Sequence, residues 1–354
     1  MRKKWTAVLA IPVLVFVWGC GGGSDEGNKE PSPEAVAEMT ACIEDSGESE
    51  KRRWRVARKL ARSKSEQAMQ SLLKVASRED ESVELRLECI RALVVQCHPG
   101  AAEGMAALAG APELRIREAA IQELWRWKGE ATTAALRKAL GDAEASVRRA
   151  ALDGLRKTGV KLTPAELETL LADKEVEIAS SAAEMVLARI DEKGCAALVQ
   201  KMLDSGVVRL RELGAQAAAT GRMKDLTPTL RKLLEDESPL VRAASAAALA
   251  ALEDKEAADA VANLLYEPDT DVVVAAAEAL RKIGGPKQAG PLTKVLQNRS
   301  IDAAARDAAL DACVALGVRT KEFFEALEWM ARFEADSELQ KKAQKTLKEL
   351  KAKE

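Results

Sequence analysis

Leucine and equivalent apolar residues recur along this chain with a period of 31 residues, and this repeat constrains the fold more than any other feature. One series slips by a residue before its last two members: Leu93, Leu124, Leu155, Val186, Leu249 and Leu280. A second series has steps of 31 or 32 residues: Leu140, Leu171, Leu203, Leu234, Leu265, Leu296 and Leu327. Two series in fixed phase indicate two structural elements in every repeat.

Each element has the spacing of a short helix. In the stretch DAEASVRRAALDGLRKTG, Val147, Ala151 and Leu155 share one helical face, Asp142 can cap the helix and Gly159 can end it. Hydrophobic residues make up 47% of the chain but aromatic residues only 3%, which favours closely packed helices of Ala, Leu and Val. A pair of short helices cannot bury its apolar face alone, so the repeats must stack. We therefore expect an all-α fold, an α-solenoid.

The helix-pair strings resemble one family in particular. DESVELRLECIRAL, DAEASVRRAALDGL and DESPLVRAASAAAL share an acidic start, a Val or Leu often followed by Arg, and an Ala-rich helix. They are similar to HEAT repeats of the short, phycobilin-lyase-like type, whereas tetratricopeptide repeats have a longer period and Trp, Gly and Tyr positions that are absent here. The resemblance implies a superhelical solenoid over residues 34–331, with eight clear units and one or two weaker ones at its start. A capping helix is expected over 332–354.

The first residues predict export. Met1 is followed by three basic residues, an apolar run from Trp5 to Trp18, and Gly19-Cys20. The run is too short to span a bilayer, and the pattern resembles a bacterial lipoprotein signal peptide over residues 1–19. The resemblance implies that Cys20 is lipidated and becomes the first residue, with 20–33 as a flexible tether. An uncleaved anchor and an ordinary cleaved signal are the alternatives, and both export the chain.

The expected location is the bacterial envelope, where the lipid-anchored protein faces the periplasm. Gly21 stands where enteric lipoproteins of the inner membrane have Asp, which favours the outer membrane. Loss of residues 1–19 leaves 51 of the 54 basic side chains against 56 acidic ones, so the formal charge changes from −2 to −5. This negative balance argues against a nucleic-acid partner.

Histidine and cysteine usage argues against a metal or another cofactor. His98 is the one histidine of the chain, and no Cys-x-x-Cys motif occurs. The cysteines besides Cys20 are an odd number, so at least one has no intramolecular disulfide partner: Cys42, Cys89, Cys97, Cys195 and Cys313. Cys89 and Cys313 occupy apolar core positions of the repeat. Cys89 and Cys97 lie about 12 Å apart along one predicted helix, which is too far for a disulfide between them.

Charged residues at fixed repeat positions form a candidate ladder. Arginines occupy one position of the repeat, with an aspartate six residues before three of them: Arg86, Arg117, Arg148 and Arg242, and Asp80, Asp142 and Asp236. In the HEAT family such pairs brace adjacent repeats, and we interpret the ladder in this way. An arginine ladder that binds phosphate groups is the alternative.

Three aromatic residues are candidates for partner binding. Trp125 aligns with Arg281, and Tyr266 aligns with Glu235, so both are expected to be exposed. Trp127 should face the core instead. Trp54 lies in the basic stretch KRRWRVARKLARSK, which is either a solvated end of the solenoid or a surface facing anionic lipid head groups.

These observations favour a non-catalytic, membrane-anchored scaffold that binds an envelope protein or peptide. The alternative is a phycobilin-lyase-like enzyme or a small-ligand binder on the same solenoid, although lyase substrates are cytosolic. HEAT-like deoxyhypusine hydroxylases hold two irons on paired His-Glu motifs, which a chain with one histidine cannot supply. The chain has no Gly-x-Ser-x-Gly elbow and no phosphate-binding Gly-rich loop. We therefore expect that the protein is not an enzyme.

Overall fold

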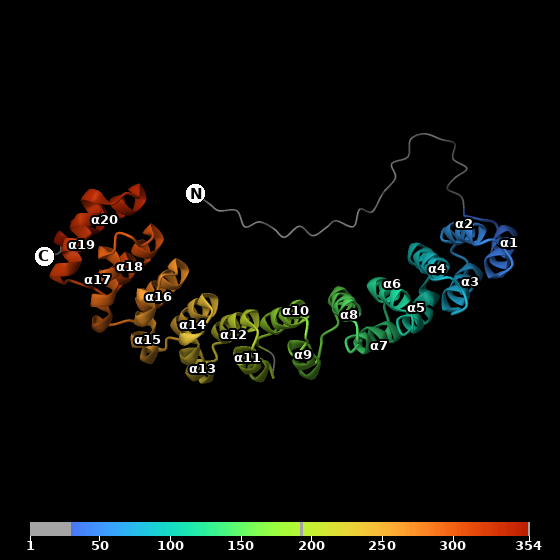
Figure 1. Cartoon of the computed structure of the whole chain (residues 1–354), viewed down its shortest axis with the longest axis horizontal. Helices are drawn as coiled ribbons and strands as arrows, with labels where there is room; N and C mark the ends of the chain where they lie inside the picture. The colour runs from blue at the N-terminus through green and yellow to red at the C-terminus, as the bar shows by residue number, and fades with distance from the viewer. Residues whose placement is uncertain (1–29, 192–193, 353–354) are drawn as a thin grey trace. The chain divides into compact units, whose positions relative to one another are not determined.

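A computed structural model describes residues 30–191 and 194–352, and every regular element within these ranges is a helix. The chain divides into two compact units, residues 1–136 and 137–354, which are described separately below (Figure 1). The expected all-α solenoid of helix pairs is confirmed. None of the helices within the described ranges is both long and apolar enough to cross a membrane.

Residues 30–136, the described part of unit 1, contain six complete α-helices and the start of a seventh, which crosses the boundary between the units. They are α1 (Pro33–Glu44), α2 (Glu50–Leu60), α3 (Glu66–Ser77), α4 (Val83–Gln96), α5 (Ala102–Leu108), α6 (Leu114–Leu124) and α7 (Glu130–Ala139). A 3₁₀ turn, η2 (Pro99–Ala101), precedes α5. Helices α2, α4 and α6 pack in one row, and α1, α3 and α5 pack in the other.

Unit 2 continues the same alternation of helices. Its α-helices are α8 (Ala145–Thr158), α9 (Pro164–Leu171), α10 (Val176–Leu187), α11 (Cys195–Leu203), α12 (Val208–Thr220), α13 (Thr227–Lys232), α14 (Pro239–Ala251), α15 (Ala258–Asn263), α16 (Thr270–Ile283), α17 (Ala289–Gln297), α18 (Ala303–Ala315), α19 (Lys321–Phe333) and α20 (Ser337–Lys351). Its 3₁₀ turns are η3 (Lys224–Leu226), η4 (Leu233–Glu235), η5 (Lys255–Ala257), η6 (Leu264–Tyr266) and η7 (Pro286–Gln288).

The helices of unit 2 form two layers, and the core lies between them. The first-helix layer consists of α10, α12, α14, α16 and α18, which pack side by side, and the second-helix layer contains α11, α13, α15, α17 and α19. The two leucine series fall in these layers: Leu249 and Leu280 are buried in first helices, and Leu265 and Leu296 in second helices. The repeat therefore positions one continuous face of second helices, on which the candidate site lies.

The sequence signal for the end of α8 holds in the structure, but the signal for its start does not. The N-cap residue of α8 is Glu144, and Asp142 accepts from the Glu144 amide at 2.9 Å, ahead of the helix. Helix α8 ends at Thr158, and Gly159 follows with φ 72°, a left-handed conformation that glycine adopts without steric cost. At the C-terminus, α20 covers α19 and buries Leu339 and Ala343, as a capping helix does. At the other end, Ser32 caps α1. The predicted signal peptide and Cys20 lie outside the described residues.

Candidate partner-binding site

Arginines near the start of first helices join consecutive repeats, and we call each such arginine with its carboxylate a rung. Arg148 is the simplest example. Its Nη1 atom donates to the carbonyl oxygens of Asp142 and Ala143 at 3.0 and 2.9 Å, which closes the preceding turn. Its Nε and Nη2 atoms donate to both carboxylate oxygens of Asp173 in the next repeat at 2.7 and 2.8 Å. This bidentate geometry is specific to the guanidinium group.

Unit 2 has further rungs of the same form. Arg211 holds Asp236 at 2.7 and 2.8 Å, Arg242 holds Glu267 at 3.0 and 2.5 Å, and Arg306 holds Glu334 at 3.0 and 2.7 Å. Each carboxylate belongs to the repeat after the arginine. The aspartate six residues before an arginine was expected to pair with it through its carboxylate. Arg242 instead donates to the main-chain oxygen of Asp236 at 2.7 Å.

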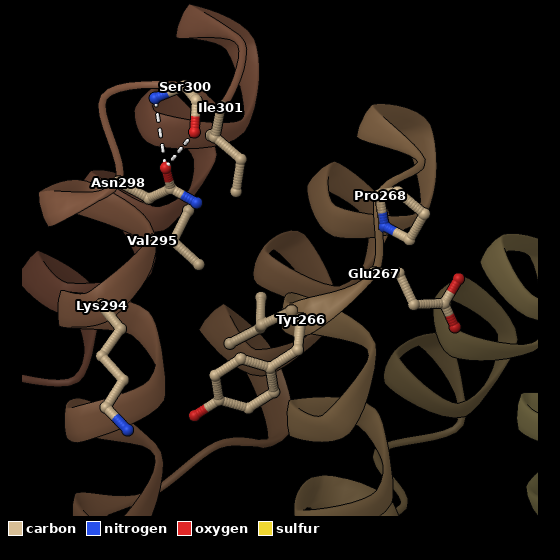
Figure 2. A pocket seen from close by; sticks show the side chains of 9 residues that line it. Tyr266, Glu267, Pro268, Lys294, Val295, Asn298, Ser300 and Ile301 are labelled. Carbon is tan, nitrogen blue, oxygen red and sulfur yellow. Dashed lines mark hydrogen bonds between the residues drawn. The ribbon is translucent and has the colours of Figure 1, made fainter.

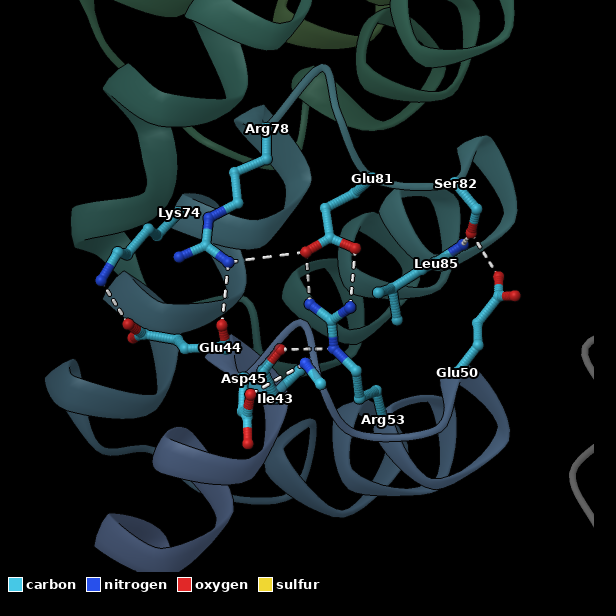
Figure 3. Close-up of polar contacts among 11 residues, drawn as sticks. Ile43, Glu44, Asp45, Glu50, Arg53, Lys74, Arg78, Glu81, Ser82 and Leu85 are labelled. Carbon is cyan, nitrogen blue, oxygen red and sulfur yellow. Dashed lines mark hydrogen bonds and ion pairs between the residues drawn. The ribbon is translucent and has the colours of Figure 1, made fainter.

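Unit 1 has its own rung in a position that the sequence analysis did not identify. Arg53 donates to Glu81 at 2.7 and 2.5 Å and to the carbonyl oxygen of Ile43 at 2.9 Å (Figure 3). Asp80, the expected member, is exposed, and its neighbour Glu81 occupies the site instead. Arg78 also contacts Glu81, at 3.5 Å, so two guanidinium groups share one carboxylate.

The other predicted ladder residues make contacts to the main chain. Arg86 is buried, and its Nε atom donates to the carbonyl oxygen of Ala76 at 2.9 Å. The Nη1 atom of Arg117 donates to the carbonyl oxygens of Ala111 and Pro112 at 3.0 and 2.9 Å. Arg86 thus ties α4 to the last turn of α3, and Arg117 holds the turn before α6.

The electrostatics of the rungs identify them as structural. Hydrogen bonds from Arg148 hold the pKa of Asp173 below its usual value, and those from Arg53 lower the pKa of Glu81. The side chains are largely enclosed: Asp173 is 7% exposed, and the Arg306–Glu334 pair is 8% and 1% exposed. A carboxylate that is buried and already held by an arginine of its own chain is not available to a ligand.

The ladder of unit 2 is interrupted at Ala179 in α10 and again at Val273 in α16, and the second interruption lies beside an open hollow. Val273 stands 31 residues after Arg242, where the next arginine would be, and Asn298 stands 25 residues after Val273, where its carboxylate would be. We call Val273 and Asn298 the ladder gap. Asn298 lines a hollow of about 410 Å³ between η6 and α17, which we call the Tyr266 hollow (Figure 2).

The Tyr266 hollow is lined by both polar and apolar side chains. The side chain of Tyr266 is 57% exposed, and the Nζ atom of Lys294 lies 5.8 Å from the centre of its ring. Asn298 accepts hydrogen bonds from Ser300 through its side-chain oxygen, at 3.1 Å from the amide nitrogen and 2.6 Å from the hydroxyl. This fixes the amide so that its Nδ2 donor faces the hollow (Figure 2). Val295 is one of the apolar side chains.

A second hollow follows in the next interval of the second-helix layer. It has a volume of about 190 Å³, lies between the end of α17 and α19, and is lined by Arg299 and Trp329. We call it the Trp329 hollow. The Cζ atom of Arg299 lies 4.4 Å from the centre of the Trp329 ring. Both hollows therefore combine a cation with an aromatic face, an arrangement worth about 0.5–1 kcal/mol at exposed sites.

The structure separates the three predicted aromatic anchors. Tyr266 is exposed and lines a hollow, whereas Trp125 is half-buried. The repeat alignment placed Trp125 as if α6 continued, but α6 ends at Leu124 and Trp125 begins a turn, so helical periodicity no longer sets its direction. Trp127, expected in the core, is buried and donates to the carbonyl oxygen of His98 at 2.8 Å.

Trp54 lines a small hollow of about 120 Å³ in unit 1 and is half-buried. The charged residues around it are largely committed to each other. Glu88 receives Arg58 at 2.6 Å and Arg91 at 3.1 Å, and Arg115 pairs with Glu84 at 2.9 Å. This hollow is a weaker candidate than the two in unit 2, because its cations are paired.

Neither histidine nor cysteine builds a metal centre in the described part of the chain, where no cluster of three or more metal-ligating side chains occurs. Five cysteines there are thiols without a disulfide. Burial raises the pKa of the Cys89 and Cys313 thiols to about 12, as expected for core cysteines. The residues that sequence reasoning missed are Lys294, Asn298, Arg299 and Trp329. The ladder gap is visible in the sequence once Val273 is aligned with Arg242.

Helix pairs stacked in two layers, with rungs between them, define an α-solenoid. Two stretches, residues 102–188 and 195–281, match the family model for HEAT repeats, and these stretches are HEAT repeats. An engineered protein of known crystal structure is 20% identical, with a TM-score of 0.50 over 89% of this chain and 98% of its own. A chain in the structure of Kap95p bound to RanGDP is 13% identical, with a TM-score of 0.53 over 88% of this chain and 50% of its own.

At such identities the likeness shows the fold alone. This chain spans half the length of the matched chain in the Kap95p structure. A comparison with curated proteins finds no match.

Proposed function

We propose that this protein is a non-catalytic scaffold that binds a protein or peptide partner through the second-helix face of unit 2. The observation that carries the proposal is the Tyr266 hollow, where an exposed aromatic side chain and Lys294 flank a preformed depression. A few anchors of this kind supply most of the energy of a protein interface. HEAT repeats and the likeness to a solenoid solved with RanGDP support the same interpretation.

We further propose that the scaffold is lipid-anchored at Cys20 and faces the periplasm from the outer membrane. The support is the sequence: three basic residues, an apolar run and Gly19-Cys20 at the start of the chain. Metabolic labelling with a palmitate analogue, followed by membrane fractionation, tests this anchor. We expect the label in the membrane-bound wild type and no label in Cys20→Ser. A Cys20→Ser variant labelled as strongly as the wild type would disprove lipidation at this residue.

Site-specific photo-crosslinking tests the scaffold function. A benzophenone amino acid is placed at Tyr266 in the full chain, and irradiated native cells are examined for covalent adducts. Leu240 is the matched control, because it is also 57% exposed but lies at the start of a first helix, α14. We expect a discrete adduct from position 266 and none from position 240. Adducts of equal yield at both positions, or no adduct at 266, would refute binding at this face.

A further inference from the structure

The chemistry of the two hollows specifies the kind of partner, given the proposed scaffold function on which this inference rests. We propose that residues 265–329 bind an extended acidic peptide segment. One carboxylate of the segment lies in the Tyr266 hollow between Lys294 and Asn298. A second acidic residue, about three positions along the peptide, meets Arg299 at the Trp329 hollow.

Charge is the first argument. In the described part of the chain, Lys294 and Arg299 contact aromatic rings and make no ion pair. A carboxylate also lines each hollow, and each contacts another cation. Glu267 pairs with Arg242 at 2.5 Å, and Glu325 pairs with Lys321 at 3.6 Å. Figure 2 shows the Glu267 side chain directed away from Lys294 and Tyr266. Among the described residues, therefore, neither Lys294 nor Arg299 has a carboxylate partner.

The donor geometry is the second argument. The Asn298 amide cannot rotate freely, because Ser300 holds its oxygen, and its Nδ2 atom remains a donor toward the hollow. The two cations lie 5.8 and 4.4 Å from the centres of the aromatic rings. Donors that are fixed before binding lose less conformational entropy when they meet an acceptor. The apolar part of the lining, which includes Val295, suits the methylene groups of an acidic side chain or its neighbour.

Repeat spacing is the third argument. Packed helices have axes about 8–10 Å apart, and an extended peptide advances about 3.3 Å per residue. A peptide that crosses the second helices therefore moves from one hollow to the next in about three residues. A polyanion such as a nucleic acid fits less well, because two cations on a protein of formal charge −2 neutralise few phosphates.

Peptide display tests the inference directly. Random 12-residue peptides are selected on the purified full-length protein, and the most enriched sequence is measured by fluorescence anisotropy. We expect enrichment of Asp or Glu at positions three apart. Binding should weaken at least tenfold in Lys294→Met and recover in Lys294→Arg. Lys282→Met is the matched control, since Lys282 is an exposed lysine in a first helix, α16, and should bind as the wild type does.

The possible failures have different meanings. Enriched peptides without acidic residues, or acidic peptides that bind Lys294→Met and wild type equally, would overturn this inference and leave the scaffold function intact. No enrichment, together with no photo-crosslink at position 266, would overturn both. The assignment is supported if the enriched acidic peptide binds wild type and Lys282→Met with equal affinity and binds Lys294→Met at least tenfold more weakly.

Discussion

Two neighbouring hollows in the second-helix layer of unit 2 lie between equivalent helices, but the cations of one are paired with carboxylates and the cation of the other is not. Between α13 and α15, Arg231 holds Asp254 through two bonds of 2.6 Å, and Arg242 holds Glu267. We call this the Arg231 hollow. In the Tyr266 hollow, one interval further on, Lys294 lies beside an aromatic ring.

The difference follows from a change at one repeat position. In the rungs of unit 2, the arginine near the start of the first helix engages a carboxylate of the next repeat. Where Val273 takes this position, the rung is lost and the carboxylate position becomes Asn298. The fold tolerates this loss because Val273 is itself buried, with 1% of its surface exposed. Paired cations thus hold the repeats together, and the interruption leaves a hollow that a partner can use.

The most buried rung provides the strongest test of this division. Arg306→Ala removes a guanidinium from a pair that is 8% and 1% exposed and leaves Glu334 charged without its partner. Breaking a buried pair in this way costs about 3–5 kcal/mol. Urea unfolding of the full chain measures the loss, with Arg299→Ala as the control that should stay within about 0.5 kcal/mol of wild type. Equal losses in both variants would refute the distinction between paired and stacked arginines.

Rebuilding the missing rung tests the ladder gap. Val273→Arg places an unpaired charge in a buried position and should lower the free energy of unfolding by about 2–4 kcal/mol. Adding Asn298→Asp supplies the missing carboxylate, so the double variant should recover at least about 1 kcal/mol in a double-mutant cycle. It should also lose peptide binding, because the new pair removes the free donors of the hollow. Additive losses would show that positions 273 and 298 do not couple.

Removal of Arg242 from the Arg231 hollow should lower stability more than removal of Lys294 from the Tyr266 hollow. Arg242→Ala loses a carboxylate pair and two bonds to main-chain oxygens, so we expect a loss of about 1–3 kcal/mol in stability. Lys294→Ala should change stability by less than about 0.5 kcal/mol. Thermal unfolding of both variants measures this contrast. A destabilised Lys294→Ala variant would mean that Lys294 is part of the structural framework.

The sequence predicted the fold well because the leucine period is carried by many residues and tolerates a register slip. It predicted the rungs only in part. Arg211 was missed although it lies 31 residues before Arg242, and the carboxylate of Asp236 was paired with Arg242 although it belongs to Arg211. A spacing of six residues cannot show whether an arginine meets a side chain or a main-chain oxygen.

The candidate site was harder to predict than the fold. The alignment predicted the exposure of Tyr266 correctly, because Tyr266 is still part of a regular element, η6, whereas Trp125 lies beyond the end of α6. It did not predict the contact of Tyr266 with Lys294, because the two residues come from different repeats and meet only when second helices pack. The same holds for Arg299 and Trp329, which belong to the loop after α17 and to α19. Interruptions of a repeat, such as Val273, are the sequence signal that could have located the hollow.

Acid provides the mildest test of the comparison. Arg148 lowers the pKa of Asp173 through its hydrogen bonds, so the folded-state pKa lies below the unfolded value of about 3.9. This contribution to stability is fully present above that value and is lost as the pH falls through the folded-state pKa. We expect the stability difference between wild type and Arg148→Gln to be constant above about pH 5 and to shrink below about pH 4.

Urea unfolding at a series of pH values measures this difference, and Lys294→Met is the control. Lys294 holds no carboxylate in the described part of the chain, so the difference between this variant and wild type should not change over the same range. The slope of each stability difference against pH therefore distinguishes a cation that is paired with a carboxylate of the folded chain from one that has no such partner. A pH-dependent difference in Lys294→Met would show an intramolecular carboxylate at the Tyr266 hollow and would remove the charge argument for an acidic partner.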